Sequence, residues 1–232
     1  MSAAELAAEL SVELPGAGHA LFTTRAEGNL STATGDDHQH GLQRRAALCE
    51  RLGLRWLCSS RQTHGPSVNT IEEVLASSGT PLAIDADAHL TALHGVGTLV
   101  MSADCLPIAL SATNVVAMVH AGWRGLAAGV IESGVGALRE QAGEQPITAV
   151  IGPGAGACCY EVGPEVHEAL TTGARDGRGH VDLRAIAHQR LTDAGVSEVR
   201  HLDACTICDT RFFSHRREGA HAGRQGGIAW LS

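Results

Sequence analysis

The sequence predicts one mixed α/β domain, of the α/β or α+β class, spanning residues 1–232. Short β-rich runs, longer segments in which apolar residues return every three or four positions, and the interleaving of the two predict this class. A chain of 232 residues fits a single domain. No repeat, low-complexity tract or long linker divides the sequence.

The β-rich runs predict the strands of a buried sheet. They lie at residues 20–24, 55–58, 98–102, 107–110, 115–120, 148–151 and 227–231. Helical spacing predicts helices over residues 42–52, 124–142 and 183–194, and residues 3–10 have the spacing of a short helix that frays. Pro107 lacks a backbone donor and favours an interrupted strand at its position.

Composition and charge exclude several classes of protein. An apolar fraction of 44% covers a sizeable core and argues against disorder. Apolar runs such as residues 115–119 are far shorter than the ~20 residues of a membrane helix. Residues 1–14 lack the features of a signal peptide, so we expect a cytoplasmic protein that contacts no membrane. A net charge of −8, with no basic cluster larger than a pair such as Arg216-Arg217, argues against nucleic-acid binding.

The seven cysteines are an odd number and do not indicate a disulfide framework. Cys205 and Cys208 have the spacing of half a zinc knuckle or of a redox pair, but no second pair of that kind follows. We therefore expect reduced, structural thiols. His38 and His40 lie in a polar loop and are left out of the predicted site.

Residues 61–160 contain histidine, cysteine, aspartate and arginine side chains at positions that are unusual for a purely structural segment. His64 follows a predicted strand, Asp104 and Cys105 stand between two strongly apolar strands, and His120 ends another. A long helical pattern begins near Arg124. Strand ends converge in α/β proteins, and a helix N-terminus offers unpaired N–H groups to an anion. This stretch is therefore where we expect the active site.

Eight ordered motifs carry a resemblance to a known family. They are Phe22-Thr23-Thr24-Arg25, Arg61-Gln62-Thr63-His64-Gly65, Asp85-Ala86-Asp87 with Thr91, Ala103-Asp104-Cys105-Leu106-Pro107, His120-Ala121-Gly122-Trp123-Arg124-Gly125, Ile151-Gly152-Pro153, Tyr160-Glu161-Val162-Gly163, and Ser214-His215-Arg216-Arg217 with Gly223-Arg224-Gln225. Over nearly its whole length the chain resembles the laccase-domain, or polyphenol oxidoreductase-like, proteins. These are also described as peptidoglycan editing factors and as purine nucleoside phosphorylases. The resemblance implies a four-layer αββα sandwich with mixed sheets.

The resemblance also implies a zinc ion bound by His64, Cys105 and His120. Two imidazoles and a thiolate are suitable zinc ligands, and three protein ligands leave the open position of a catalytic site. The implied reaction is phosphorolysis of adenosine, inosine or guanosine, extended to methylthioadenosine, with adenosine deamination at the same site. The implied partners are a purine nucleoside and phosphate, in a monomer or small homo-oligomer.

Phosphorolysis needs a cation that holds phosphate beside the anomeric carbon, and our candidates are Arg25, Arg61 and Arg124. Deamination needs a carboxylate that moves a proton, for which Asp104 comes first and Asp87 second. The list of predicted catalytic residues is Asp104, Cys105 and Arg61.

Each of these residues also has an ordinary structural interpretation. A single histidine more often makes a hydrogen bond, and a single cysteine such as Cys105 is usually a small buried hydrophobe. Asp104 can be a turn or capping residue, and Arg124 can pair with Glu132. The segment between Arg25 and Arg45 looks shorter than the family pattern, and Thr63 replaces its commoner valine. These departures bear on substrate preference.

Three other functions remain open. Cys105 could be the nucleophile of an amide hydrolase that edits peptidoglycan precursors, with His120 as base and Asp104 as orienter. A blue-copper centre of a polyphenol oxidase could use the same three ligands with Met101 or Met118. A non-catalytic zinc protein is disfavoured because structural zinc normally has four protein ligands. True laccase chemistry is disfavoured because the 13 histidines are scattered.

Overall fold

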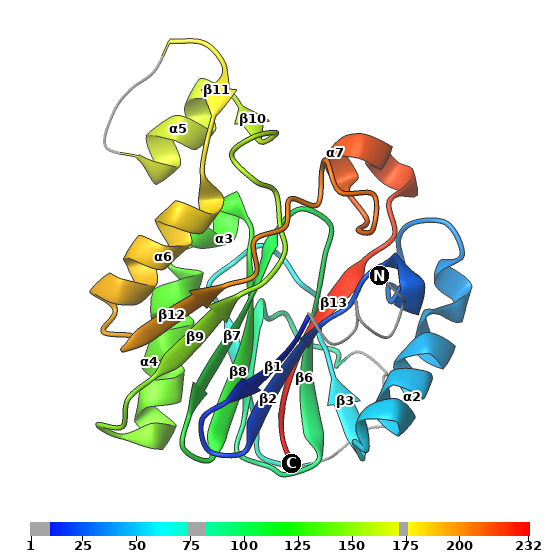
Figure 1. Cartoon of the computed structure of the whole chain (residues 1–232), viewed down its shortest axis with the longest axis vertical. Helices are drawn as coiled ribbons and strands as arrows, with labels where there is room; N and C mark the ends of the chain where they lie inside the picture. The colour runs from blue at the N-terminus through cyan, green and yellow to red at the C-terminus, as the bar shows by residue number, and fades with distance from the viewer. Residues whose placement is uncertain (1–9, 74–81, 172–175) are drawn as a thin grey trace.

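The computed structural model describes residues 10–73, 82–171 and 176–232 (Figure 1). The helix expected at residues 3–10 lies outside these ranges, apart from Leu10. Two mixed sheets contain most of the strands. No helix within the described ranges is long and apolar enough to cross a membrane.

The first sheet has the order β1-β2-β13-β6-β3. Its strands are β1 (Ser11–Leu14), β2 (Gly18–Phe22), β13 (Gln225–Leu231), β6 (Val96–Ser102) and β3 (Trp56–Cys58). Neighbouring strands are antiparallel except for the parallel pair of β3 and β6. The C-terminal strand β13 thus lies in the middle of the sheet, hydrogen-bonded to β2 on one side and β6 on the other.

The second sheet has the order β12-β9-β7-β8-β5-β4. Its strands are β12 (Glu198–His201), β9 (Thr148–Ile151), β7 (Leu106–Ala112), β8 (Val115–Ala121), β5 (Ala88–Thr91) and β4 (Val68–Ile71). The outer pairs β12–β9 and β5–β4 are parallel, and the inner pairs are antiparallel. A separate small ribbon joins β10 (Glu161–Val162) to β11 (Gly179–His180).

The sheets pack face to face, and helices cover their outer faces (Figure 1). Phe22, Val100 and Met118 belong to the core between the sheets. Outside the first sheet lies α2 (Gly41–Leu52), and outside the second lie α4 (Val130–Ala142) and α6 (Leu183–Asp193). The shorter helices are α3 (Trp123–Ala128), α5 (Pro164–Leu170) and α7 (His215–Glu218), and the 3-10 turns are η1 (Arg25–Glu27), η2 (His38–His40) and η3 (Gly219–His221). The prediction of a mixed α/β protein with two mixed sheets is confirmed.

The helix predicted over residues 124–142 is two helices, α3 and α4, because Gly129 adopts a left-handed φ of 88° between them. The sequence pattern also missed β1, β4, β5 and β12, and the two-residue strands β10 and β11. β4 and β12 are the edges of the second sheet, so their side chains need not be uniformly apolar. β5 is fully buried but contains His89, which hides its apolar character.

Candidate metal centre and active site

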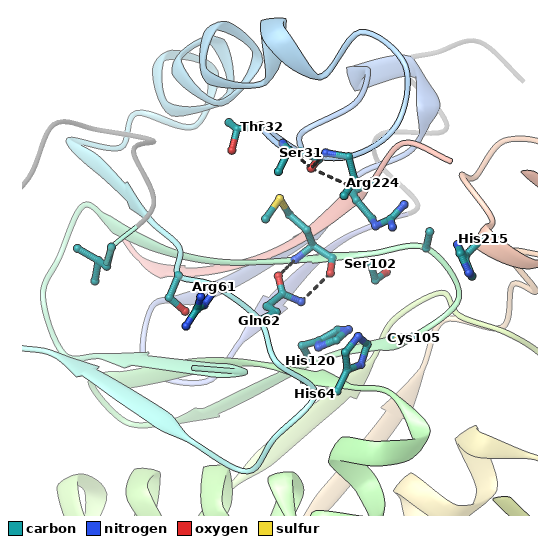
Figure 2. Close-up of a pocket in the computed structure, with 16 residues that line it drawn as sticks. Ser31, Thr32, Arg61, Gln62, His64, Ser102, Cys105, His120, His215 and Arg224 are labelled. Atoms are coloured by element: carbon teal, nitrogen blue, oxygen red, sulfur yellow. Dashed lines mark hydrogen bonds between the residues drawn. The ribbon is translucent and has the colours of Figure 1, made fainter. Parts of the chain in front are cut away.

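Three connections bring the predicted zinc ligands together. His64 lies in the loop between β3 and β4, Cys105 in the crossing from β6 of the first sheet to β7 of the second, and His120 near the end of β8. Their nitrogen and sulfur atoms all lie within 4.8 Å of one another. The two imidazole centroids are 4.9 Å apart. Figure 2 shows the three side chains clustered at one end of a cavity.

Gly122 has no side chain, and this leaves room for the cluster. A Cβ atom at position 122 would lie 2.7 Å from Sγ of Cys105 and 3.0 Å from Nδ1 of His64. A methyl group would therefore displace two of the three donor side chains. The glycine two residues after His120 has a direct steric reason to be there.

A single buried carboxylate, that of Asp87, organises both histidines. It accepts hydrogen bonds from the backbone N–H groups of Thr63, His64 and Gly65, at 2.9 to 3.0 Å. These bonds hold His64 at a left-handed φ of 59°, a conformation that residues other than glycine rarely adopt. Asp87 also lies 2.7 Å from Nδ1 of His120, which leaves Nε2 of that ring for the cluster. Burial raises the pKa of Asp87, but the hydrogen bonds from His120, Gly65 and Thr63 bring it down to about 2.

Electrostatics favour a thiolate at Cys105. Burial raises the pKa of this thiol, but His120 and His64 outweigh it and lower the pKa to about 6. Burial lowers the pKa of His120, while Cys105 and Asp87 raise it to about 9. A thiolate and two imidazoles converging on one point, one of them oriented by a carboxylate, form a donor set that fits zinc.

The cluster opens into a cavity of about 630 Å³. Gln62 forms one wall, where its side-chain amide donates to the carbonyl of Met101 and accepts from its N–H, both at 2.8 Å. Ser102 Oγ is buried and has no hydrogen-bond partner among the described residues. Across the cavity from the donor cluster lie Ser31, Thr32 and Arg224 (Figure 2). The Ser102 hydroxyl can reach a polar ligand in the cavity if the side chain rotates toward it.

The three arginines proposed for phosphate occupy different places. Arg61 lines the cavity, but its guanidinium pairs with Asp85 at 2.5 and 2.8 Å. Arg25 is not among the lining residues; it pairs with Glu218 and stacks over the ring of Phe213 at 4.4 Å. Arg124 is exposed, also outside the lining, and lies 4.3 Å from the Trp123 ring. Of the three arginines, only Arg61 contributes to the wall.

Asp104 is directed away from the cavity. Its carboxylate accepts a hydrogen bond from Oγ1 of Thr206 at 2.7 Å and another from the backbone N–H of Arg216 at 2.8 Å. Asp104 does not line the cavity, and the carboxylate on His120 is Asp87. The orienting residue expected at Asp104 is thus Asp87 in the structure. Glu132, the alternative partner considered for Arg124, pairs with Arg190 at 3.2 Å.

Two cavity residues, Arg224 and His215, were not singled out from the sequence. Arg224 donates to the carbonyls of Ala222 and Gly223 and forms no ion pair within the described ranges. Burial lowers the pKa of Arg224. Both residues stand in the last quoted motif, 214–217 with 223–225. They could have been found from the sequence because both are basic side chains in a family motif to which no role had been assigned.

The family model for multi-copper polyphenol oxidoreductase laccase matches residues 16–232. The chain belongs to this family. Among the relatives of this chain, a purine nucleoside phosphorylase of Xylella fastidiosa (strain 9a5c) is 39% identical over 236 residues. The alignment covers 94% of this chain and 88% of the relative. Adenosine deaminase RL5, from an unknown prokaryotic organism, is 36% identical over 219 residues and 84% of each chain. The crystal structure of Neisseria meningitidis protein NMB0706 is 32% identical, with a TM-score of 0.83, over 96% of this chain and 98% of that one. The resemblance inferred from the motifs is confirmed.

Proposed function

We propose that this chain is a zinc-dependent purine nucleoside phosphorylase that also deaminates adenosine, built as one domain over residues 1–232. One observation carries the proposal: Arg224 lines the same cavity as the cluster of His64, Cys105 and His120. Its volume of about 630 Å³ falls within the ~300–1,000 Å³ typical of small-ligand sites. The phosphorylase and deaminase relatives support the assignment.

Arg224 is the cation best placed to hold phosphate. The charge of Arg61 is already matched by Asp85, whereas Arg224 has only carbonyl partners in the described part of the chain. A guanidinium without a carboxylate can form charge-assisted hydrogen bonds with an incoming anion. The free hydroxyl of Ser102 can bind the same anion or a sugar hydroxyl. Arg61 then contributes at the edge of the cavity.

His64, Cys105 and His120 would hold the zinc ion, which when bound supplies a Lewis acid that polarises a substrate oxygen. Asp87 fixes the tautomer of His120 by its bond to Nδ1. Through three backbone N–H groups it also keeps the loop at residues 63–65 in place. The protein thereby positions the donors before any substrate binds.

Deamination also needs a group that moves a proton. No carboxylate is among the described lining residues, and Asp104 is engaged by Thr206 and Arg216. His215 lines the cavity and its Nδ1 lies 3.1 Å from the carbonyl of Gly219. When Nδ1 donates to that carbonyl, Nε2 is the free acceptor. His215 is therefore our candidate for the proton carrier.

The test uses purified, metal-analysed protein with adenosine or inosine, with and without phosphate, and follows free base, ribose-1-phosphate and ammonia. We expect base release that depends on phosphate, and ammonia from adenosine. Cys105→Ala should abolish both reactions. Cys58→Ala, which removes a buried thiol outside the site, should retain them. If no nucleoside turns over under any of these conditions, the proposal is wrong.

A Cys/His amide hydrolase is the second candidate, favoured by the chain of contacts from Asp87 to His120 to Cys105. Cys105 would then be the nucleophile and His120 the base, with Asp87 as orienter. The two candidates separate cleanly, because a hydrolase keeps its activity after chelation and turns over no nucleoside. A copper centre gains no support: Met118 is packed in the core, and the sulfur of Met101 accepts a hydrogen bond from Arg45.

A further inference from the structure

We propose that Cys158, Cys159, Cys205 and Cys208 form a second zinc site, structural rather than catalytic and separate from the cavity. Their Sγ atoms all lie within 4.8 Å of one another. All four are free thiols, although the sequence separates the two pairs widely. The sequence predicted structural thiols at Cys205 and Cys208. It did not identify Cys158 and Cys159 as their partners, because adjacent cysteines do not have the usual spacing of two intervening residues.

The spacing of the sulfurs fits one metal ion. In a tetrahedral site with zinc–sulfur bonds of about 2.3 Å, the sulfurs lie ~3.8 Å apart. Sγ of Cys158 and Sγ of Cys208 are 4.0 Å apart. A disulfide between them would require about 2.05 Å. An iron–sulfur cluster would require wider spacing, because several iron atoms and sulfides must fit between the cysteines.

The fold holds the two pairs together without any metal. β9 and β12 are parallel neighbours at one edge of the second sheet (Figure 1), and the loop that follows each strand carries one pair. Gly154 continues the pairing beyond the strands, with its N–H directed to the carbonyl of Ala204 and its carbonyl accepting from Thr206. The cysteine pairs are therefore placed by backbone hydrogen bonds.

Backbone N–H groups surround the sulfur of Cys205. Gly156 donates to it at 3.2 Å. The backbone N–H groups of Cys208 and Ile207 are also directed to this sulfur. Donors of this kind stabilise thiolates that bind metal. Arg217 adds positive charge beside the turn, donating to the carbonyls of Thr206 and Ile207 at 2.8 Å each.

Four protein thiolates leave no open coordination position, so this zinc would be a structural support, called the strut below. Binding releases the thiol protons and ties the loop after β9 to the loop after β12. Thr206, inside the second pair, donates to Asp104, the residue next to Cys105. The strut would thus support the segment that carries one ligand of the first site.

The experiment counts zinc in the full-length chain, expressed with zinc and purified under reducing conditions. We expect about two zinc ions per chain, from one three-donor and one four-donor site. The pair Cys158→Ser with Cys208→Ser, both exposed in the structure, should leave about one zinc ion, as should Cys105→Ala. The matched control Cys58→Ala should keep about two. The difference between wild type and the double variant reports the four-cysteine site alone, whereas Cys105→Ala reports the zinc of the proposed function, so the two proposals fail separately.

The wild-type protein gives a second readout in case the double variant fails to fold. Cobalt added to the zinc-free chain should show the strong charge-transfer and visible bands of tetrathiolate coordination, and Cys105→Ala should retain them. Thiol titration of the native protein should find the four cysteines protected until a chelator is added. Equal zinc content in wild type and the double variant, a mass that reports a disulfide, or iron with inorganic sulfide would each overturn the proposal.

Discussion

Asp87 lies 2.7 Å from Nδ1 of His120 and accepts the backbone N–H of His64 at 3.0 Å. One carboxylate therefore fixes two of the three donors at the proposed catalytic metal site. Because the orientation of a metal-binding histidine depends on such partners, Asp87→Asn should weaken zinc binding at this site by about 10- to 100-fold. Competition with a chromophoric chelator measures the change.

The matched control for this change is Asp37→Asn, which removes an exposed carboxylate paired with Arg44. It should leave zinc affinity unchanged. Equal affinities for wild type and Asp87→Asn would show that Asp87 does not position the donors.

Gly122→Ala should lower zinc occupancy at the same site while the protein remains folded. The new methyl group would lie 2.7 Å from Sγ of Cys105, so the donors must move apart. Gly136→Ala in α4 is the control, since nothing lies within 4 Å of a Cβ there. It should be neutral or stabilise the helix by up to about 1 kcal/mol. Zinc content and thermal unfolding, measured on both variants, decide the matter; full zinc binding by Gly122→Ala would refute the steric argument.

Arg224→Met should raise KM for phosphate by about ten- to hundredfold, because a hydrogen bond to a charged group contributes about 1.5–3 kcal/mol. Its zinc content should not change. Arg124→Met, on an exposed arginine stacked over Trp123, should change KM by less than about twofold. A larger rise in KM for Arg124→Met than for Arg224→Met would instead place the phosphate site at the start of α3.

The stability of the protein should fall on acidification because of His89. This side chain is fully buried in β5, with Nε2 3.1 Å from Oγ of Ser60, and burial lowers its pKa to about 4. Its pKa in the unfolded chain is about 6.5, so protons bind the unfolded state more tightly. The contribution of His89 is complete above pH ~6.5 and is lost as pH falls toward ~4.

Between pH 7 and pH 5 the loss should be about 2 kcal/mol of unfolding free energy. Urea unfolding of the metal-free protein at both values measures it. His89→Gln should remove this part of the pH dependence, whereas His180→Gln, at an exposed position in β11, should retain it. Identical slopes for wild type and His89→Gln would contradict the assignment.

Local patterns predicted most of the apolar strands, since these depend on residue types close together in sequence, whereas the three-donor set came from the family resemblance carried by the motifs. Asp104 illustrates what local patterns miss: it stands beside Cys105, yet its left-handed backbone directs the carboxylate to Thr206 and Arg216. Asp87, further away in sequence, contacts both histidines because β5 pairs with β8. Arg224 reaches the cavity through the chain segment before β13, and the four-cysteine cluster exists only because β9 and β12 are neighbours. These placements depend on which strands are neighbours in the sheets. The hydrophobic periodicity of the sequence does not predict that order.

The central position of β13 has a consequence for biosynthesis. Within the described ranges, residues 225–231 alone join β2 to β6, so the first sheet remains in two halves while the ribosome is still translating the preceding chain. Its apolar inner face and the open edges of β2 and β6 stay exposed until that strand emerges, a period in which aggregation competes with folding. A nascent chain released before residue 225 should therefore depend on chaperones rather than fold on its own.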